Sequence, residues 1–146
     1  MTEHVPVKAA FVDSVPEWRG AVRTAAGLLV DIGTADEAYV DDCVTSVEEH
    51  GPYIVLTPGV ALAHAQARPG STNEGLAAVR LGAPVEFGHP TNDPVDLVLA
   101  FSSGGSHVAM IRAMGKALSR GLATRLRDAG DVAEAEEALA EVVARD

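Results

Sequence analysis

Residues 51–65, GPYIVLTPGVALAHA, decide the fold that we expect for this chain. Two apolar runs within this segment predict short strands at 53–56 and 60–64. Between them, Pro58 pre-sets the φ of one central turn position, and Gly59 accepts the positive φ of the next. The segment therefore predicts two strands joined by a tight turn, and the second strand ends on a histidine.

That histidine, His64, is the first candidate for a functional residue. Side chains alternate across a strand, so Val60, Leu62 and His64 share one face and the imidazole continues an apolar row. The ordinary pKa of histidine, about 6.5, leaves one ring nitrogen unprotonated at neutral pH. A nucleophilic ring held by rigid backbone suits a group-transfer site, although a purely structural histidine stays open from spacing alone.

Strand-like and helix-like segments alternate along the rest of the chain. Predicted strands are 9–12, 76–81 and 95–101, and predicted helices are 16–30, 34–49, 108–120, 122–128 and 131–144. Thr34 with Glu37, and Asp131 with Glu134, form the pattern of a capping box at the start of two helices. This alternation predicts a single α/β domain over residues 1–146.

Two helices have apolar rows that we expect to face the core. In the helix at 34–49, Cys43 lies among valines at helical spacing, which predicts a packed thiol rather than a reactive one. A single cysteine also excludes an internal disulfide. In the helix at 108–120, the row expected to point inward is Val108, Ile111, Met114, Ala117 and Leu118.

Composition excludes several function classes. The chain has 146 residues and a net charge of −10, which argues against a nucleic-acid partner because phosphates are neutralised by lysine and arginine. The same charge allows a basic protein partner. No run approaches the roughly 18 apolar residues of a membrane span, and the first residues, MTEHVPVKAA, lack the pattern of a signal peptide. We therefore expect a cytoplasmic protein.

A second histidine follows a serine- and glycine-rich run. His107 comes after SSGGS at 102–106, where a predicted helix begins, and helix N-termini favour anions. If the strand ends are neighbours, His64 and His107 converge on one cleft. His64 would then attack phosphorus, and His107 with backbone amides would stabilise the phosphoryl oxygens. A metal site using both histidines stays open, although further ligands are not apparent.

Segment 49–65 resembles the active-site signature of the enzyme IIA family of the bacterial sugar phosphotransferase system, mannitol/fructose type. In that signature, an acidic or amide residue lies upstream of an aliphatic-Ala-aliphatic-Pro-His run. The matching residues are Glu49, Leu56, Val60, Ala61, Leu62 and His64. The segments PVEFGHPTNDPVDLVLAF (84–101) and GGSHVAMIRAMGKAL (104–118) are similar to the ascorbate-type branch. Ala63 stands where the family usually has proline.

The resemblance implies a fold and a function. The fold is α/β, with a single mixed β-sheet and helices packed on both faces. His64 would be phosphorylated by phospho-HPr and would pass the phosphoryl group to a cysteine of enzyme IIB. Enzyme IIB works with the membrane component IIC in sugar uptake. The similarity to the ascorbate-type branch makes ascorbate the expected compound. His107 would contact the phosphoryl group.

The family implies a phosphotransferase without a cofactor or metal, and a homodimer is compatible with it. A regulatory module that signals its phosphorylation state is the alternative. For His89, a surface-loop role is expected.

Overall fold

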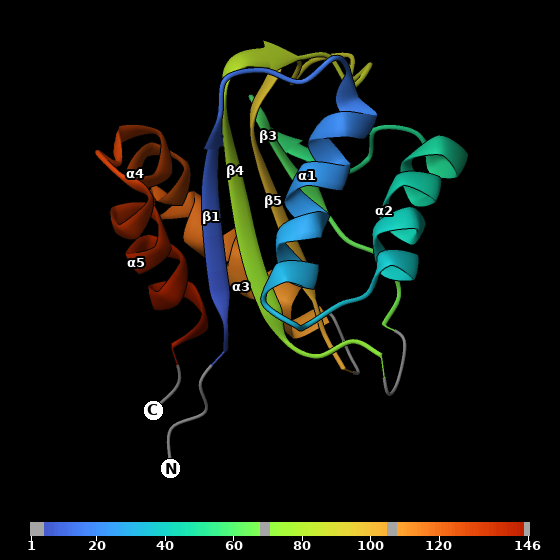
Figure 1. The fold of residues 1–146 in the computed structure, drawn as a ribbon. Coiled ribbons are helices and arrows are strands. Elements are labelled where there is room, and N and C mark those ends of the chain that lie inside the picture. The colour runs from blue at the N-terminus through green and yellow to red at the C-terminus, as the bar shows by residue number, and fades with distance from the viewer. Residues whose placement is uncertain (1–4, 68–70, 105–107, 145–146) are drawn as a thin grey trace.

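The computed structural model describes residues 5–67, 71–104 and 108–144. Five strands and five helices lie along these ranges (Figure 1). In chain order they are β1 (Val7–Val12), α1 (Trp18–Asp31), α2 (Glu37–His50), β2 (Val55–Thr57), β3 (Val60–Ala63), β4 (Gly75–Val85), β5 (Val95–Ser102), α3 (Val108–Ser119), α4 (Leu122–Asp128) and α5 (Val132–Val143).

The strands form one mixed sheet in the order β1-β4-β5-β3-β2. β1 runs parallel to β4, and β3 runs parallel to β5, whereas the β4–β5 and β2–β3 pairs are antiparallel. The mixed sheet expected from the resemblance is therefore confirmed, and the strand predicted at 9–12 lies at one edge. Because β3 and β5 are parallel, their carboxyl ends lie at the same end of the sheet.

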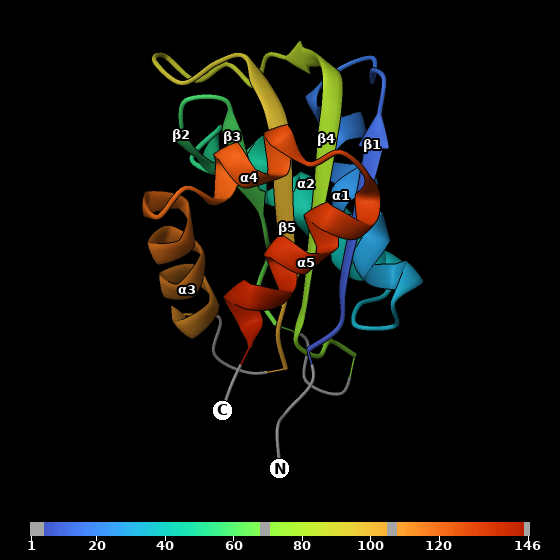
Figure 2. The ribbon, with the colours of Figure 1, turned by 90° about the vertical axis from the view of Figure 1, so that its left-hand side faces the viewer.

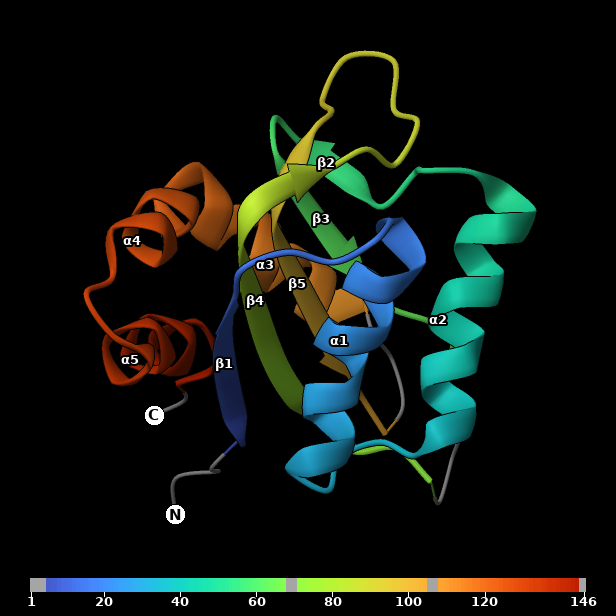
Figure 3. The ribbon, with the colours of Figure 1, turned by 45° about the horizontal axis from the view of Figure 1, so that its top comes forward.

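Helices cover both faces of this sheet, as the views in Figures 2 and 3 show. α1 and α2 lie on one face, and α3, α4 and α5 lie on the other. Along β5, Val98 packs towards the first layer, while Leu97 and Leu99 pack towards the second. Each of these leucines is fully buried, which stabilises the fold by about 1.5–3 kcal/mol per side chain. The predicted strand at 95–101 is thus a central strand covered on both faces.

The predicted N-cap of α2 is wrong by two residues. Asp36, rather than Thr34, is the N-cap, and its carboxylate accepts the backbone N–H of Tyr39 at 2.9 Å. Thr34 is buried instead, and its hydroxyl accepts a hydrogen bond from the Ser102 hydroxyl at 3.0 Å. Thr34 is thus a buried polar link between the α1–α2 turn and the end of β5.

The capping box of α5 forms in a modified way. Asp131 accepts the N–H of Glu134 at 2.8 Å, as predicted, but the Glu134 carboxylate reaches Gly130 N at 3.0 Å.

At the end of α4, the guanidinium of Arg80 from β4 donates to the carbonyl oxygens of Leu126 and Ala129, at 3.0 and 2.9 Å. A cation there satisfies carbonyls that the helix leaves open.

The buried face of α3 matches the predicted row only in part: Met114 is buried, and Ala117 and Leu118 pack against the core. Met110 and Met114 are buried, whereas Val108 and Ile111 are 53% and 37% exposed. The apolar row that the 3.6-residue period marks is therefore turned partly towards solvent. α3 packs against α4 and α5 at the margin of the layer, so only a narrow stripe of its surface meets the core.

In the described ranges, no helix is long and apolar enough to cross a bilayer.

Candidate functional site

The hairpin that carries His64 matches the prediction, with shifted boundaries. β2 begins at Val55, so Tyr53 lies in the preceding turn, and β3 ends at Ala63. Gly59 has a φ of 77°, as the turn requires. β3 ends directly before His64, and its residues pair in parallel with β5, Ala63 opposite Ala100. His64 is thus fixed at the carboxyl end of the sheet by pairing up to the preceding residue.

Two aromatic rings hold the imidazole of His64. The ring stacks on Phe101 with centroids 5.2 Å apart and an interplanar angle of 11°. Tyr53 approaches edge-on, with centroids 6.0 Å apart at 81°. Phe101 is fully buried, whereas His64 is half-buried. The aromatic contacts therefore restrict the tilt of the imidazole while part of the residue stays accessible.

A hydrogen bond within the strand end fixes the tautomer of His64. Nδ1 lies 2.9 Å from the carbonyl oxygen of Leu62. A carbonyl oxygen only accepts, so Nδ1 carries the proton, and the lone pair of the neutral ring resides on Nε2. The arrangement prepares Nε2 to act as a nucleophile.

Tyr39 on α2 links the residue after His64 to strand β5. Its hydroxyl donates to the carbonyl oxygen of Phe101 at 2.6 Å and accepts the backbone N–H of Ala65 at 3.2 Å. Burial raises the pKa of this hydroxyl well above its usual value, so it stays a neutral donor. The sequence places Tyr39 on the inward face of its helix but does not show this role. The signal in the sequence that could have indicated this role is the hydroxyl group on an inward-facing position, because a buried tyrosine needs a polar partner.

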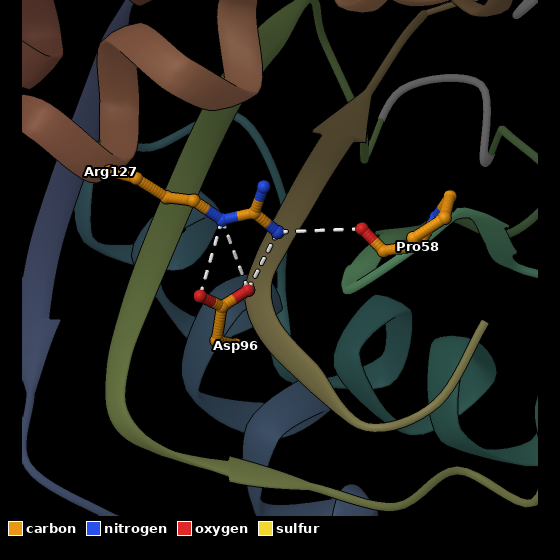
Figure 4. A network of polar contacts seen from close by, with 3 residues as sticks. All are labelled: Pro58, Asp96 and Arg127. Atoms are coloured by element: carbon orange, nitrogen blue, oxygen red, sulfur yellow. Dashed lines mark hydrogen bonds and ion pairs between the residues drawn. The ribbon is translucent and has the colours of Figure 1, made fainter.

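At the other end of the hairpin, an ion pair fixes the turn (Figure 4). Arg127 on α4 binds both carboxylate oxygens of Asp96 on β5, the shorter contact being 2.7 Å. The same guanidinium reaches the carbonyl oxygen of Pro58 at 3.5 Å. The turn is also tied to the sheet by the backbone, since Gly59 accepts the N–H groups of Asp96 and Leu97 at 3.1 Å. The turn of the hairpin is therefore anchored at the end away from His64.

Buried hydroxyl groups occupy the end of β5. Thr72 donates to the carbonyl oxygen of Ser103 at 2.6 Å, and the Ser102 hydroxyl also lies 2.8 Å from the carbonyl oxygen of Asn73. Ser102 and Ser103 are therefore not a free loop, contrary to what a serine- and glycine-rich run suggests. Their interactions order the backbone at the end of β5.

The second predicted site residue, His107, lies outside the described residues, as do Gly105 and Ser106. Its convergence with His64 stays a prediction. α3 spans Val108–Ser119, against a predicted helix at 108–120.

The remaining candidates have structural surroundings. His89 lies in a turn, where Nδ1 accepts the backbone N–H groups of Thr91 and Asn92 at 3.1 and 3.0 Å. Cys43 is buried, which confirms the packed thiol, and burial raises its pKa to about 12. Within residues 5–67, 71–104 and 108–144, no three His, Cys, Asp or Glu side chains are placed to hold a metal ion.

A family model described as "Phosphoenolpyruvate-dependent sugar phosphotransferase system, EIIA 2" matches residues 4–145. The chain belongs to this enzyme IIA family. The resemblance noted in segment 49–65 is thereby confirmed for nearly the whole chain.

Similar proteins support the assignment. This enzyme IIA is 38% identical over 86 residues to an ascorbate-specific PTS system EIIA component of Shigella boydii, and 35% identical to the one of Escherichia coli K12. The match covers 59% of this chain and 56% of those relatives, so the chain spans about half the length of the curated relatives it matches.

Solved structures agree with the fold. The cryptic mannitol-specific enzyme IIA of Escherichia coli has a TM-score of 0.73 and 28% identity, covering 91% of this chain and 89% of its own. An Escherichia coli enzyme IIA solved in complex with phosphorylated enzyme IIB has a TM-score of 0.74 at 23% identity, covering 90% and 94% of the two chains.

Proposed function

We propose that this enzyme IIA is a cytoplasmic phosphocarrier and that His64 accepts the phosphoryl group on Nε2. The observation that carries the proposal is the 2.9 Å contact between His64 Nδ1 and the Leu62 carbonyl oxygen. It places the lone pair on Nε2 before any donor arrives, so no proton has to leave the attacking nitrogen.

In the forward step, the Nε2 lone pair attacks the phosphorus of phosphohistidine in phospho-HPr. A new N–P bond forms on His64 while the donor N–P bond breaks, and its electron pair returns to the donor nitrogen. The phosphorylated His64 ring carries more positive charge than the neutral ring. The Leu62 carbonyl oxygen, which already accepts the Nδ1 proton, stabilises that charge.

In the second step, a cysteine thiolate of enzyme IIB attacks the same phosphorus, and the electron pair of the N–P bond returns to Nε2. The family name and the ascorbate-specific relatives support a role in sugar uptake together with IIB and membrane-bound IIC. The transported compound we propose is ascorbate.

We retain His107 as the residue that stabilises the phosphoryl oxygens. The support is its position directly before α3, where backbone amides and the helix dipole favour an anion. Ala63, in place of the usual proline, is compatible with the proposal because it is buried and paired with Ala100 in the sheet. Sheet pairing restrains the backbone before His64 in the way that proline would by its fixed φ.

The test is incubation with phospho-HPr that carries labelled phosphate. We expect acid-labile label on Nε2 of His64, assigned by nitrogen NMR, and its passage to the cysteine of enzyme IIB. His64→Ala should abolish labelling, whereas His50→Ala, an exposed histidine at the end of α2, should leave it intact. Labelled protein that cannot pass the group to IIB would favour the regulatory alternative, and label on a different residue would refute the assignment.

A further inference from the structure

A surface groove lies between α3 and α5 on the face of the sheet opposite α1. It has a volume of about 710 Å³ and is closed at one end by the start of α4. Figure 2 shows α3 and α5 apart on this face, with α4 crossing between their ends. We call it the α3–α5 groove. It is separate from the contacts that hold His64.

Two parallel rows of side chains, from α3 and the residue that follows it, Arg120, line the groove. The first row is small and apolar: Ala109, Ala113 and Ala117. The second row is cationic: Arg112, Lys116 and Arg120. Each row has a spacing of four residues and spans about 12 Å along the helix axis. The small side chains of the alanine row allow another helix to approach the floor of the groove closely, and the cationic row makes one rim of the groove positively charged.

The three cations differ from the other basic residues in the described ranges. All the others bind oxygen atoms of the chain: Lys8, Arg19, Arg23, Arg80, Arg125 and Arg127. For Arg112, Lys116 and Arg120, no side-chain hydrogen bond or ion pair forms with any described residue. Three unpaired cations in one row are unexpected in a chain with a net charge of −10, where carboxylates are abundant.

The opposite wall of the groove restricts the orientation of a ligand. Glu141 on α5 is already bound by Arg125, through two contacts of 2.9 Å. The unpaired positive charge is therefore confined to the α3 side, while Ala138 and Val142 make the α5 side apolar. A ligand that fits both walls has an anionic edge next to an apolar edge.

We propose that the α3–α5 groove binds an acidic amphipathic helix of a partner protein. Carboxylates at every fourth position of such a helix repeat with the same spacing as the cations of α3. Its small apolar residues pack on the alanine row, since small side chains allow two helices to approach closely. The chain's overall negative charge disfavours nucleic acid and an anionic membrane, whose charge extends well beyond the groove.

The test uses a synthetic peptide, acetyl-ALAQELAQELAQELA-amide, with glutamates at every fourth position, and a counterpart with glutamine at those positions. Binding to the full chain is followed by anisotropy of the labelled peptide and by amide NMR shifts. We expect the glutamate peptide to shift the amides of Ala113 and Ala117, and added salt to weaken its binding. The glutamine counterpart should bind about tenfold more weakly.

The matched variants have equal changes in net charge. In the double variant Arg112→Glu/Lys116→Glu, binding should fall by at least about tenfold. The control, Arg19→Glu/Arg23→Glu on α1, should bind within about twofold of the unaltered chain. Circular dichroism checks that both variants are folded.

Several results would overturn the proposal. Equal binding of the two peptides, equal losses in both double variants, or NMR shifts confined to other surfaces would each do so. Binding of phosphatidylglycerol vesicles without binding of the peptide would assign the cations to a lipid surface instead. Because the measurements need no phosphoryl group, repeating them on His64→Ala separates this outcome from that of the phosphocarrier proposal.

Discussion

The hydroxyl group of Tyr39 lies 2.6 Å from the carbonyl oxygen of Phe101 and donates a hydrogen bond to it. This contact joins α2 to the strand whose aromatic ring stacks on His64. Because the same hydroxyl accepts the N–H of Ala65, it restrains both the residue that follows His64 and the strand that carries the stacked ring. Tyr39 is therefore a positioning residue in the proposed phosphotransfer.

Replacing Tyr39 with phenylalanine should reduce both stability and the rate of phosphotransfer. The variant leaves a buried carbonyl and an amide without their partner, which is expected to lower the free energy of unfolding by about 1–3 kcal/mol. We expect the rate of His64 phosphorylation to fall about tenfold as the ring loses its fixed position. Urea unfolding and rapid-quench labelling measure the two effects.

Tyr53→Phe is the matched control for stability. The Tyr53 side chain is exposed, and its hydroxyl bonds only to the partly exposed Ser46 among the described residues. The expected change in the free energy of unfolding is within about 0.5 kcal/mol. Equal losses in the two variants would contradict the role assigned to Tyr39.

Gly59→Ala should destabilise the hairpin. Gly59 has a φ of 77°, and an added Cβ would lie 2.6 Å from Nη2 of Arg127. Left-handed backbone and displacement of the ion pair together are expected to cost about 1–3 kcal/mol. Thermal unfolding measures the loss.

The same substitution at Gly115, Gly115→Ala, should stabilise the protein, in contrast to Gly59→Ala. Gly115 lies inside α3, and an added Cβ would have no heavy atom within 4 Å. Alanine should raise the free energy of unfolding by about 0.5–1 kcal/mol, since it restricts the unfolded chain and favours helix. A stabilised Gly59→Ala variant would show that the turn tolerates a side chain.

Arg127→Gln should cost more stability than Arg125→Gln. The Arg127–Asp96 pair is about two-thirds buried, with side chains 34% and 35% exposed, whereas the Arg125–Glu141 pair is 48% and 66% exposed. Solvent screens the second pair more strongly, so we expect a loss of about 1 kcal/mol for Arg127→Gln and a clearly smaller loss for Arg125→Gln. Chemical denaturation at low and high salt distinguishes them, because salt should affect mainly the exposed pair.

Cys43 should resist alkylation in the folded protein. Burial raises the pKa of its thiol to about 12, whereas an unfolded thiol ionises near pH 8.5, an approximate reference value. Iodoacetamide at pH 8 is expected to modify Cys43 only after denaturation, as mass spectrometry would show. Rapid labelling of the folded chain would contradict the burial.

The same pKa shift has a consequence for stability. As pH rises from about 8.5 towards 12, the unfolded chain releases the thiol proton that the folded chain keeps, so the free energy of unfolding falls. Below this range, the contribution of Cys43 is fully present. In Cys43→Ala, the fall across this range should be shallower, which pH-dependent urea unfolding can measure.

Local patterns in the sequence predict most of the elements and the position of His64. The alternation of Val60, Leu62 and His64 requires only the two-residue period of a strand, and the turn before it requires only the backbone preferences of Pro58 and Gly59. Both are properties of neighbouring residues. They are therefore visible without knowledge of the rest of the chain.

Tertiary packing decides which residues surround the histidine and which face of a marginal helix is buried. The stack of Phe101 on His64 and the bonds of Tyr39 join segments far apart in the chain, and no local period encodes such contacts. Likewise, Val108 and Ile111 have helical spacing but remain exposed, because α3 meets the core along a narrow stripe. The sequence by itself determined the strand that leads to His64 and the family of the chain. The fold alone fixed the ring's neighbours and tautomer, because both depend on atoms brought together by the sheet.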